Sequence, residues 1–219
     1  MIHNKIITDE MLDTLRKRIR ESMSSFRVAH TLGVEEMAAR IGGIYCPEKV
    51  DLLRAAALLH DITKELSPAA QKSIFAKHGV EMSRDVENAQ PTQHAITAAL
   101  EIPELYADFA DEELIGAVRY HTTGRENMTL VEKILYLSDY IDFTRTYSDC
   151  KALRDMFWNA DIAGMTERQR LIHLNKVILK SFDLTVIDLI ENGRIVSADT
   201  VNARNSLMLE IKNQIKQEK

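Results

Sequence analysis

Hydrophobic residues recur along this chain at intervals of three and four positions, the spacing of an amphipathic helix. Leu12, Leu15 and Ile19 show the pattern first, in a segment that Thr8 or Asp9 can cap. The segments that we expect to be helical are 8–24, 26–41, 49–62, 68–78, 93–100, 111–120, 129–143, 171–189 and 199–217. No segment alternates clearly with the period of a strand, so the pattern predicts an all-α protein.

Glycine pairs and turn residues divide these segments. The helix over 26–41 should stop at Gly42–Gly43, and the long pattern that follows residue 148 should stop at Asn192–Gly193. We therefore expect an all-α domain over residues 1–190 and a C-terminal helical extension over residues 191–219.

The composition agrees with a helical protein. Eight glycines and four prolines in 219 residues are few, because average usage is roughly 7 % glycine and 5 % proline. The turns that a β-sandwich or barrel needs are therefore scarce. Hydrophobic residues make up 45 % of the chain and charged residues 28 %, which is too apolar for a disordered protein.

Charge and hydropathy exclude several kinds of partner. The net charge of −5 disfavours binding to nucleic acid, which depends on Lys and Arg meeting phosphates. The longest uncharged stretch, Asn88 to Leu100, contains Gln, Pro and His, whereas a membrane span needs about 20 apolar residues. No apolar signal-peptide core follows the first residue, and Cys46 and Cys150 are too few for a disulfide framework. We therefore expect a cytoplasmic protein with no nucleic-acid or membrane partner.

Several common catalytic motifs are absent. The eight glycines form neither a dinucleotide-binding fingerprint nor a P-loop. The chain also lacks Cys-x-x-Cys, the Glu-x-x-His pattern of di-iron helix bundles and the Gly-x-Ser-x-Gly nucleophile elbow. The remaining candidates for chemistry are histidines and aspartates within apolar segments.

Two of the predicted helices place an aspartate among apolar residues. His60 and Asp61 end the most apolar helix, over 49–62, and Asp139 lies on the same helical row as Leu135. A buried carboxylate without a partner costs several kcal/mol. We therefore expect positive charge to face Asp139, and the polar groups of His60 and Asp61 to be satisfied by partners.

A third predicted helix directs His30 inward, on the row of Phe26 and Val34. Taken singly, His30 or His94 can be a hydrogen-bonded core residue, and His121 can be a plain C-cap residue. Asp139 can pair with an arginine. Taken together, the residues suit a polynuclear site of imidazole and carboxylate ligands. The candidate ligands are His30, His60, Asp61, His94, His121 and Asp139.

The order of these residues is similar to that of the HD-domain metal phosphohydrolases. The run from His121 to Arg145 begins His-Thr-Thr-Gly-Arg and ends Asp-Tyr-Ile-Asp-Phe-Thr-Arg. It resembles the bacterial YqeK-type family of symmetrical bis(5'-nucleosyl)-tetraphosphatases, whose run begins the same way and ends Asp-Tyr-Ile-Glu-Pro-x-Arg. Asp142 and Phe143 replace that Glu and Pro, and Ala95 replaces the Gly that usually follows the histidine. The resemblance covers about residues 10–190.

The resemblance implies an all-α HD-domain bundle with a dinuclear metal site between core helices. It also implies that a metal-activated water cuts diadenosine tetraphosphate symmetrically into two ADP. The two ions would be divalent transition metals, iron above all, with Mn, Co, Ni and Zn as alternatives. One ion would be held by His30, His60, Asp61 and Asp139, and the other by Asp61, His94 and His121, so that Asp61 bridges them.

A polyphosphate substrate of a net acidic protein requires local positive charge. We expect Lys64, Arg125 and Arg145 to bind phosphate, with Lys64 and Arg125 also stabilising the leaving group. The hydroxyl of Thr122 should donate to a phosphate, and Gly124 should bring the backbone beside one.

Other functions fit the same residues. The chain could be another HD-domain nucleotide phosphohydrolase, either a nucleotidase or a phosphodiesterase, or a nucleotide-sensing HD module without catalysis. It could also be a structural protein with buried histidines. The amphipathic segment 171–189 fits either the core or the face of a homodimer.

Overall fold

The computed structural model describes residues 6–216, and within them the chain forms helices and no β-strand. This confirms the all-α prediction. None of the helices that it describes is long and apolar enough to cross a membrane. The α-helices are α1 (Asp9–Ser22), α2 (Ser25–Tyr45), α3 (Val50–Leu59), α4 (Pro68–Lys77), α5 (Arg84–Asn88), α6 (Gln93–Leu105), α7 (Glu112–Tyr120), α8 (Leu130–Ile141), α9 (Ser148–Trp158), α10 (Glu167–Glu191) and α11 (Ala198–Lys216).

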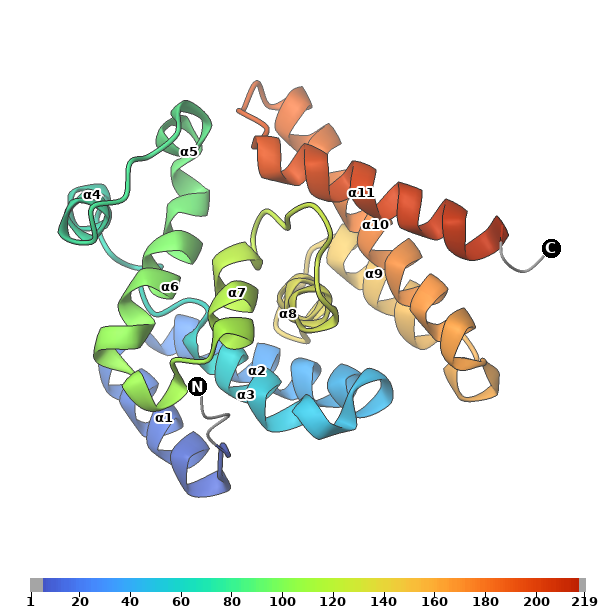
Figure 1. Cartoon of the computed structure of the whole chain (residues 1–219), viewed down its shortest axis with the longest axis horizontal. Helices are drawn as coiled ribbons and strands as arrows, with labels where there is room; N and C mark the ends of the chain where they lie inside the picture. The colour runs from blue at the N-terminus through green and yellow to red at the C-terminus, as the bar shows by residue number, and fades with distance from the viewer. Residues whose placement is uncertain (1–5, 217–219) are drawn as a thin grey trace.

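Helix α8 lies at the centre of the molecule, with α2, α3 and α7 on one side and α9, α10 and α11 on the other (Figure 1). Its residues from Val131 to Ser138 are all buried, as expected of a helix enclosed on most of its faces. Helices α4, α5 and α6 form the far flank beside α7 (Figure 1). The central position of α8 lets its C-terminal end meet residues from several other helices.

Side-chain caps define where many of these helices begin. Thr8 caps α1, Ser67 caps α4 and Asp111 caps α7, each accepting a hydrogen bond from a backbone N–H of the first turn. Thr129 and Glu132 form a complete capping box at the start of α8. Local sequence therefore sets these N-termini.

The prediction that the second helix stops at Gly42 was wrong, because α2 continues through both glycines to Tyr45. Gly42 is buried against α3: a Cβ atom there would lie 2.6 Å from Leu53 Cδ1. The glycine is therefore a close-packing position between two helices and not a helix stop.

Two helices, α5 and α9, were not predicted, and α6 was predicted too short. Helix α5 has five residues, and α9 buries only three, Cys150, Leu153 and Phe157, so its pattern was weak. Helix α6 runs to Leu105 although it contains Pro103. The burial of its apolar face between α4 and α7 offsets the cost of the proline.

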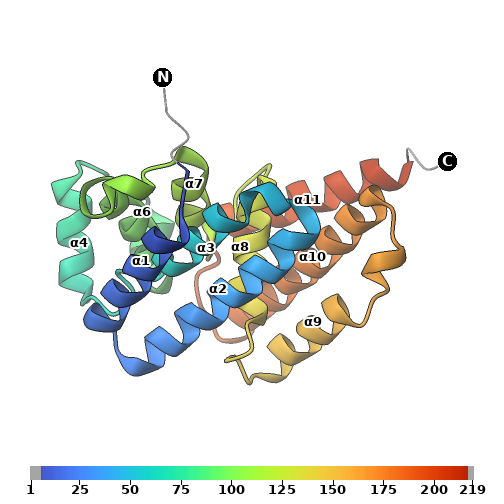
Figure 2. The same cartoon turned by 90° about the horizontal axis from the view of Figure 1, so that it is seen from below.

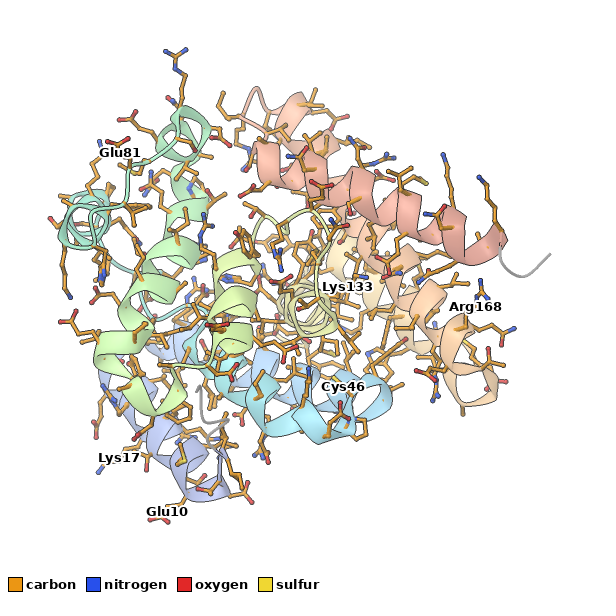
Figure 3. The ribbon with its side chains drawn as sticks, in the orientation of Figure 1. Glu10, Lys17, Cys46, Glu81, Lys133 and Arg168 are labelled. Carbon is orange, nitrogen blue, oxygen red and sulfur yellow. The ribbon has the colours of Figure 1, made fainter. Side chains whose placement is uncertain are left out.

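The C-terminal helices α10 and α11 lie side by side (Figure 2). Helix α11 is also tied to α8 through Lys133, a side chain labelled in Figure 3. Its Nζ lies 2.7 Å from Glu210 Oε2. The division into 1–190 and 191–219 stays a prediction, and Gln217, the expected last helical residue, lies outside the described residues. Phe182 and its buried neighbours place the middle of the 171–189 segment in the core, while a homodimer stays a prediction.

Candidate metal centre

Five separate elements bring the six candidate ligands together. His30 lies in the second turn of α2, and Asp139 lies near the C-terminal end of α8. His60 and His121 are the C-cap residues of α3 and α7, and His94 is in the first turn of α6. Helix ends therefore supply most of the site.

Three of the histidines share one local geometry. The Nδ1 atoms of His60, His94 and His121 lie 2.6, 2.9 and 2.7 Å from a backbone carbonyl oxygen three residues earlier. Those carbonyl oxygens can accept the Nδ1–H, which leaves each Nε2 with its lone pair free. Metal-binding histidines are oriented in the same way by hydrogen bonds from their second nitrogen.

The free Nε2 atoms converge on the carboxylate of Asp61, which is 3 % exposed. One oxygen, Oδ1, lies 3.1 Å from His94 Nε2 and 3.8 Å from His121 Nε2. The other, Oδ2, lies 3.3 Å from His60 Nε2 and 3.7 Å from His30 Nε2. The two oxygens thus face two different sets of imidazoles, as a bridging carboxylate would.

His30 connects this cluster to the second aspartate. Its Nε2 lies 3.0 Å from Asp139 Oδ1, and its Nδ1 lies 3.3 Å from Oδ2 of the buried Asp142. Asp142 accepts hydrogen bonds from the backbone N–H and the hydroxyl of Thr144. Asp142, which stands where the family pattern has Glu, therefore contacts the imidazole ring of His30 and would orient it.

Charges within the site set the protonation states. Burial alone would raise the pKa of Asp61, yet His60 and His94 hold it well below its usual range. Burial is likewise overcome at Asp139, where Arg145 and His30 keep the pKa low. Both carboxylates are therefore charged at neutral pH.

The imidazoles divide into two kinds. Burial lowers the pKa of His94 and lowers that of His121 well below its usual value. Burial also opposes protonation of His30, but Asp139 and Asp142 outweigh it and raise the pKa to about 9. His94 and His121 are thus neutral and able to donate a lone pair, whereas His30 carries a proton that a bound metal ion would displace.

The residues present fit divalent metal ions. Nε2 of His60 is buried without a hydrogen-bond partner, which is costly unless something else binds it. His30, His60 and Asp139 each offer a ligand atom within 4.8 Å of the others, and so do His60, Asp61 and His121. Imidazole and carboxylate donors together suit Fe, Mn, Co, Ni and Zn.

A cavity of about 760 Å³ opens above these ligands. Of the residues expected to bind phosphate, Lys64, Thr122 and Arg145 line it. Lys64 does not follow on a continued helix, because α3 ends at Leu59 and a turn places Lys64 Nζ 3.3 Å from His94 Nδ1. Burial lowers the pKa of Lys64.

The structure does not bring Arg125 or Gly124 to this cavity. Arg125 pairs with Glu132, at 2.9 Å between Nε and Oε1. Gly124 has a φ of +64°, and a Cβ atom there would lie 2.6 Å from Phe182 Cζ. Gly124 is therefore needed for chain direction and packing under α10, in contrast to the phosphate-side role expected from the sequence.

Sequence reasoning missed Arg27, whose Nη1 lies 2.5 Å from Asp61 Oδ2. The sequence feature that could have identified Arg27 was its position three residues before His30 on the same helix. It also placed Phe26 on an apolar core row, whereas Phe26 is 76 % exposed and lines the cavity, as does the exposed Tyr147. Helical periodicity does not distinguish a core face from the wall of a cavity.

Comparison with known families agrees with this geometry. The family described as HD domain matches residues 27–144, more than half of the chain, and the match includes all six candidate ligands. The chain therefore belongs to the HD-domain family, and its helical bundle with clustered His and Asp side chains is an HD-domain fold.

Individual relatives extend over most of the chain. A symmetrical bis(5'-nucleosyl)-tetraphosphatase from Halalkalibacterium halodurans is 27 % identical over 194 residues, covering 89 % of this chain and 95 % of the relative. One of the same name from Bacillus subtilis is 27 % identical over 87 % of this chain and 94 % of its own. The crystal structure of a predicted HD superfamily hydrolase involved in NAD metabolism from Clostridium acetobutylicum matches with a TM-score of 0.77 at 30 % identity, covering 90 % of this chain and 97 % of that one.

Proposed function

We propose that this protein hydrolyses diadenosine tetraphosphate symmetrically into two molecules of ADP, the class of activity for which its relatives are named. The observation that carries the proposal is the convergence of four imidazole Nε2 atoms on Asp61 and Asp139 at the floor of a large cavity. In the reaction, a water oxygen bonds to one of the two inner phosphorus atoms while the bond from that phosphorus to the central bridging oxygen breaks.

The six candidate ligands would hold two divalent ions, and iron is our proposal for the ions bound in the cell. Such ions activate water and stabilise charge on the phosphoryl oxygens. Asp61 would contribute one oxygen toward each group of imidazoles. Asp142 would keep the His30 ring oriented, because Oδ2 of Asp142 lies 3.3 Å from Nδ1 of His30.

The chain's own cations would bind the phosphates. Lys64 and Arg145 line the cavity beside the candidate ligands, and Arg145 Nη2 lies 2.5 Å from Asp139 Oδ1. A guanidinium and an ammonium at this position can stabilise the negative charge of departing ADP. Thr122 is a hydroxyl donor at the same wall, with Oγ1 3.4 Å from His94 Nε2.

The size and lining of the cavity favour a nucleotide over a bare phosphate. Cavities of roughly 300–1,000 Å³ hold drug-sized ligands, and this one measures about 760 Å³. Away from the candidate ligands and the basic residues, its wall consists mostly of aromatic, hydroxyl and carboxylate side chains, which suit a nucleoside. These side chains include Tyr136, Tyr140, Tyr147, Thr185 and Asp188.

The reaction is tested by product analysis. Metal-stripped protein loaded with Fe²⁺, Mn²⁺ or Co²⁺ and incubated with diadenosine tetraphosphate should yield ADP as the only nucleotide product, measured by chromatography. Formation of ATP and AMP would mean asymmetric cleavage and would overturn the proposal. No turnover with any of these metals would favour a nucleotide-sensing module instead.

Tyr147 should contribute to recognition of the nucleoside. Tyr147 is 73 % exposed and lines the cavity, and stacking of a base on an aromatic ring is worth about 1–3 kcal/mol. Tyr147→Ala should raise KM for diadenosine tetraphosphate by roughly five- to 150-fold, with little change in kcat. Met156→Ala, at an exposed position of α9 outside the cavity lining, is the control. Equal KM values in the two variants would exclude a role for Tyr147 in binding.

A further inference from the structure

Arg27 holds an unusual position beside the candidate metal centre. It lies in the first turn of α2, its side chain is 17 % exposed, and its Nη1 lies 2.5 Å from Asp61 Oδ2. Its Nε is buried without a hydrogen-bond partner, although a guanidinium offers five donors. The residue lines the same cavity as Lys64 and Arg145.

The guanidinium of Arg27 uses an oxygen that a metal ion would also need. Asp61 Oδ2 is the oxygen that faces His60 and His30, at 3.3 and 3.7 Å from their Nε2 atoms. A cation held by those imidazoles and the charged arginine would repel each other while sharing one carboxylate oxygen. Metal binding should therefore weaken the Arg27–Asp61 ion pair.

Arg145 differs from Arg27 in how firmly it is held. Its Nη2 pairs with Asp139 Oδ1, and its Nε also donates to the backbone carbonyl oxygen of Asp139, both at 2.5 Å. Arg27 has one ion-pair contact and no comparable backbone anchor among the hydrogen bonds of the described residues. Of the two guanidiniums, Arg27 is the one free to change partner.

We propose that Arg27 is an exchangeable phosphate anchor. It neutralises Asp61 while no ion is bound, and it turns its donors to a phosphate oxygen of the nucleotide once metal occupies the site. This inference rests on the proposed function only in that the ligand is a polyphosphate. A guanidinium binds phosphate with two parallel hydrogen bonds, which supplies the third cation that the sequence had assigned to Arg125.

Two measurements on Arg27→Ala test the proposal. In metal-stripped protein without nucleotide, removal of the competing cation should tighten Mn²⁺ binding by roughly three- to tenfold. In Mn²⁺-loaded protein, affinity for both ADP and inorganic pyrophosphate should fall by roughly ten- to 100-fold. Both affinities can be measured by isothermal titration calorimetry, which requires no turnover.

Arg27→Lys and Arg40→Ala complete the experiment. The lysine variant keeps the charge but loses the two-pronged geometry, so its pyrophosphate affinity should be intermediate. Arg40 lies on the same helix and pairs with the exposed Glu36, so Arg40→Ala should change neither affinity. If Arg27 only held Asp61 in place for the metal, Arg27→Ala would bind Mn²⁺ more weakly, and that result would overturn the proposal. Unchanged pyrophosphate affinity in both Arg27 variants would also overturn it. Failure of the wild-type protein to form ADP would contradict only the proposed function.

Discussion

Replacing Asp61 with asparagine is expected to lower hydrolysis of diadenosine tetraphosphate by at least about 10³-fold. Both carboxylate oxygens face imidazoles, Oδ1 toward His94 and His121 and Oδ2 toward His60. Asparagine keeps the shape of the side chain but removes its charge and one acceptor oxygen. The metal content of the purified protein should therefore fall together with its activity.

Activity assays with Mn²⁺ and elemental analysis check this prediction, and far-UV circular dichroism should show an unchanged helical spectrum. Asp51→Asn is the matched control, because Asp51 lies on the adjoining helix α3 with a half-exposed side chain that pairs with Arg54. Asp51→Asn should retain both metal and turnover. An Asp61→Asn protein that still holds metal and turns over substrate would end the two-metal proposal.

Replacing Gly124 with alanine is expected to lower the free energy of unfolding by about 2–5 kcal/mol. The residue has a φ of +64°, where an alanine is strained by about 1–2 kcal/mol. Its Cβ would also lie 2.6 Å from Phe182 Cζ and 2.9 Å from Ala203 Cβ. Overpacking in a core adds roughly 1–3 kcal/mol, so the two effects act together.

Denaturant unfolding measures this loss, and Gly79→Ala separates its two causes. Gly79 has almost the same φ, +63°, but no atom lies within 4 Å of the position its Cβ would take. Gly79→Ala should therefore show the backbone strain alone. If the free energy of unfolding fell equally in the two variants, the contact of Gly124 with α10 and α11 would make no contribution to the loss.

The candidate ligands illustrate how far local sequence information reaches. His30, His60 and Asp139 could be identified because each places a polar side chain within an apolar helical segment, and such a placement is costly without a partner. The arrangement of the His60, His94 and His121 rings is also local, since each Nδ1 faces a carbonyl three residues earlier. Their convergence on one carboxylate could be expected only from the family resemblance.

The positively charged side chains show what local sequence does not predict. Arg125 looked well placed because it follows His121 by four residues, yet its side chain is held by Glu132. Arg27 was not among the candidate cations, yet it reaches Asp61, which lies 34 residues further along the chain. A charged side chain is long and flexible, so its partner depends on which helix packs beside it.

The sequence by itself determined the all-α class, most of the helix starts and the residue types that can hold a metal. These properties depend on periodicity, capping and side-chain chemistry within a few residues. Only the tertiary structure decided that Gly42 and Gly124 are packing positions, that Phe26 and Tyr147 line a cavity, and which arginines neutralise the two aspartates. The reason is that these contacts join segments that are distant in sequence. The sequence of a single segment does not specify how its helix is placed relative to the others.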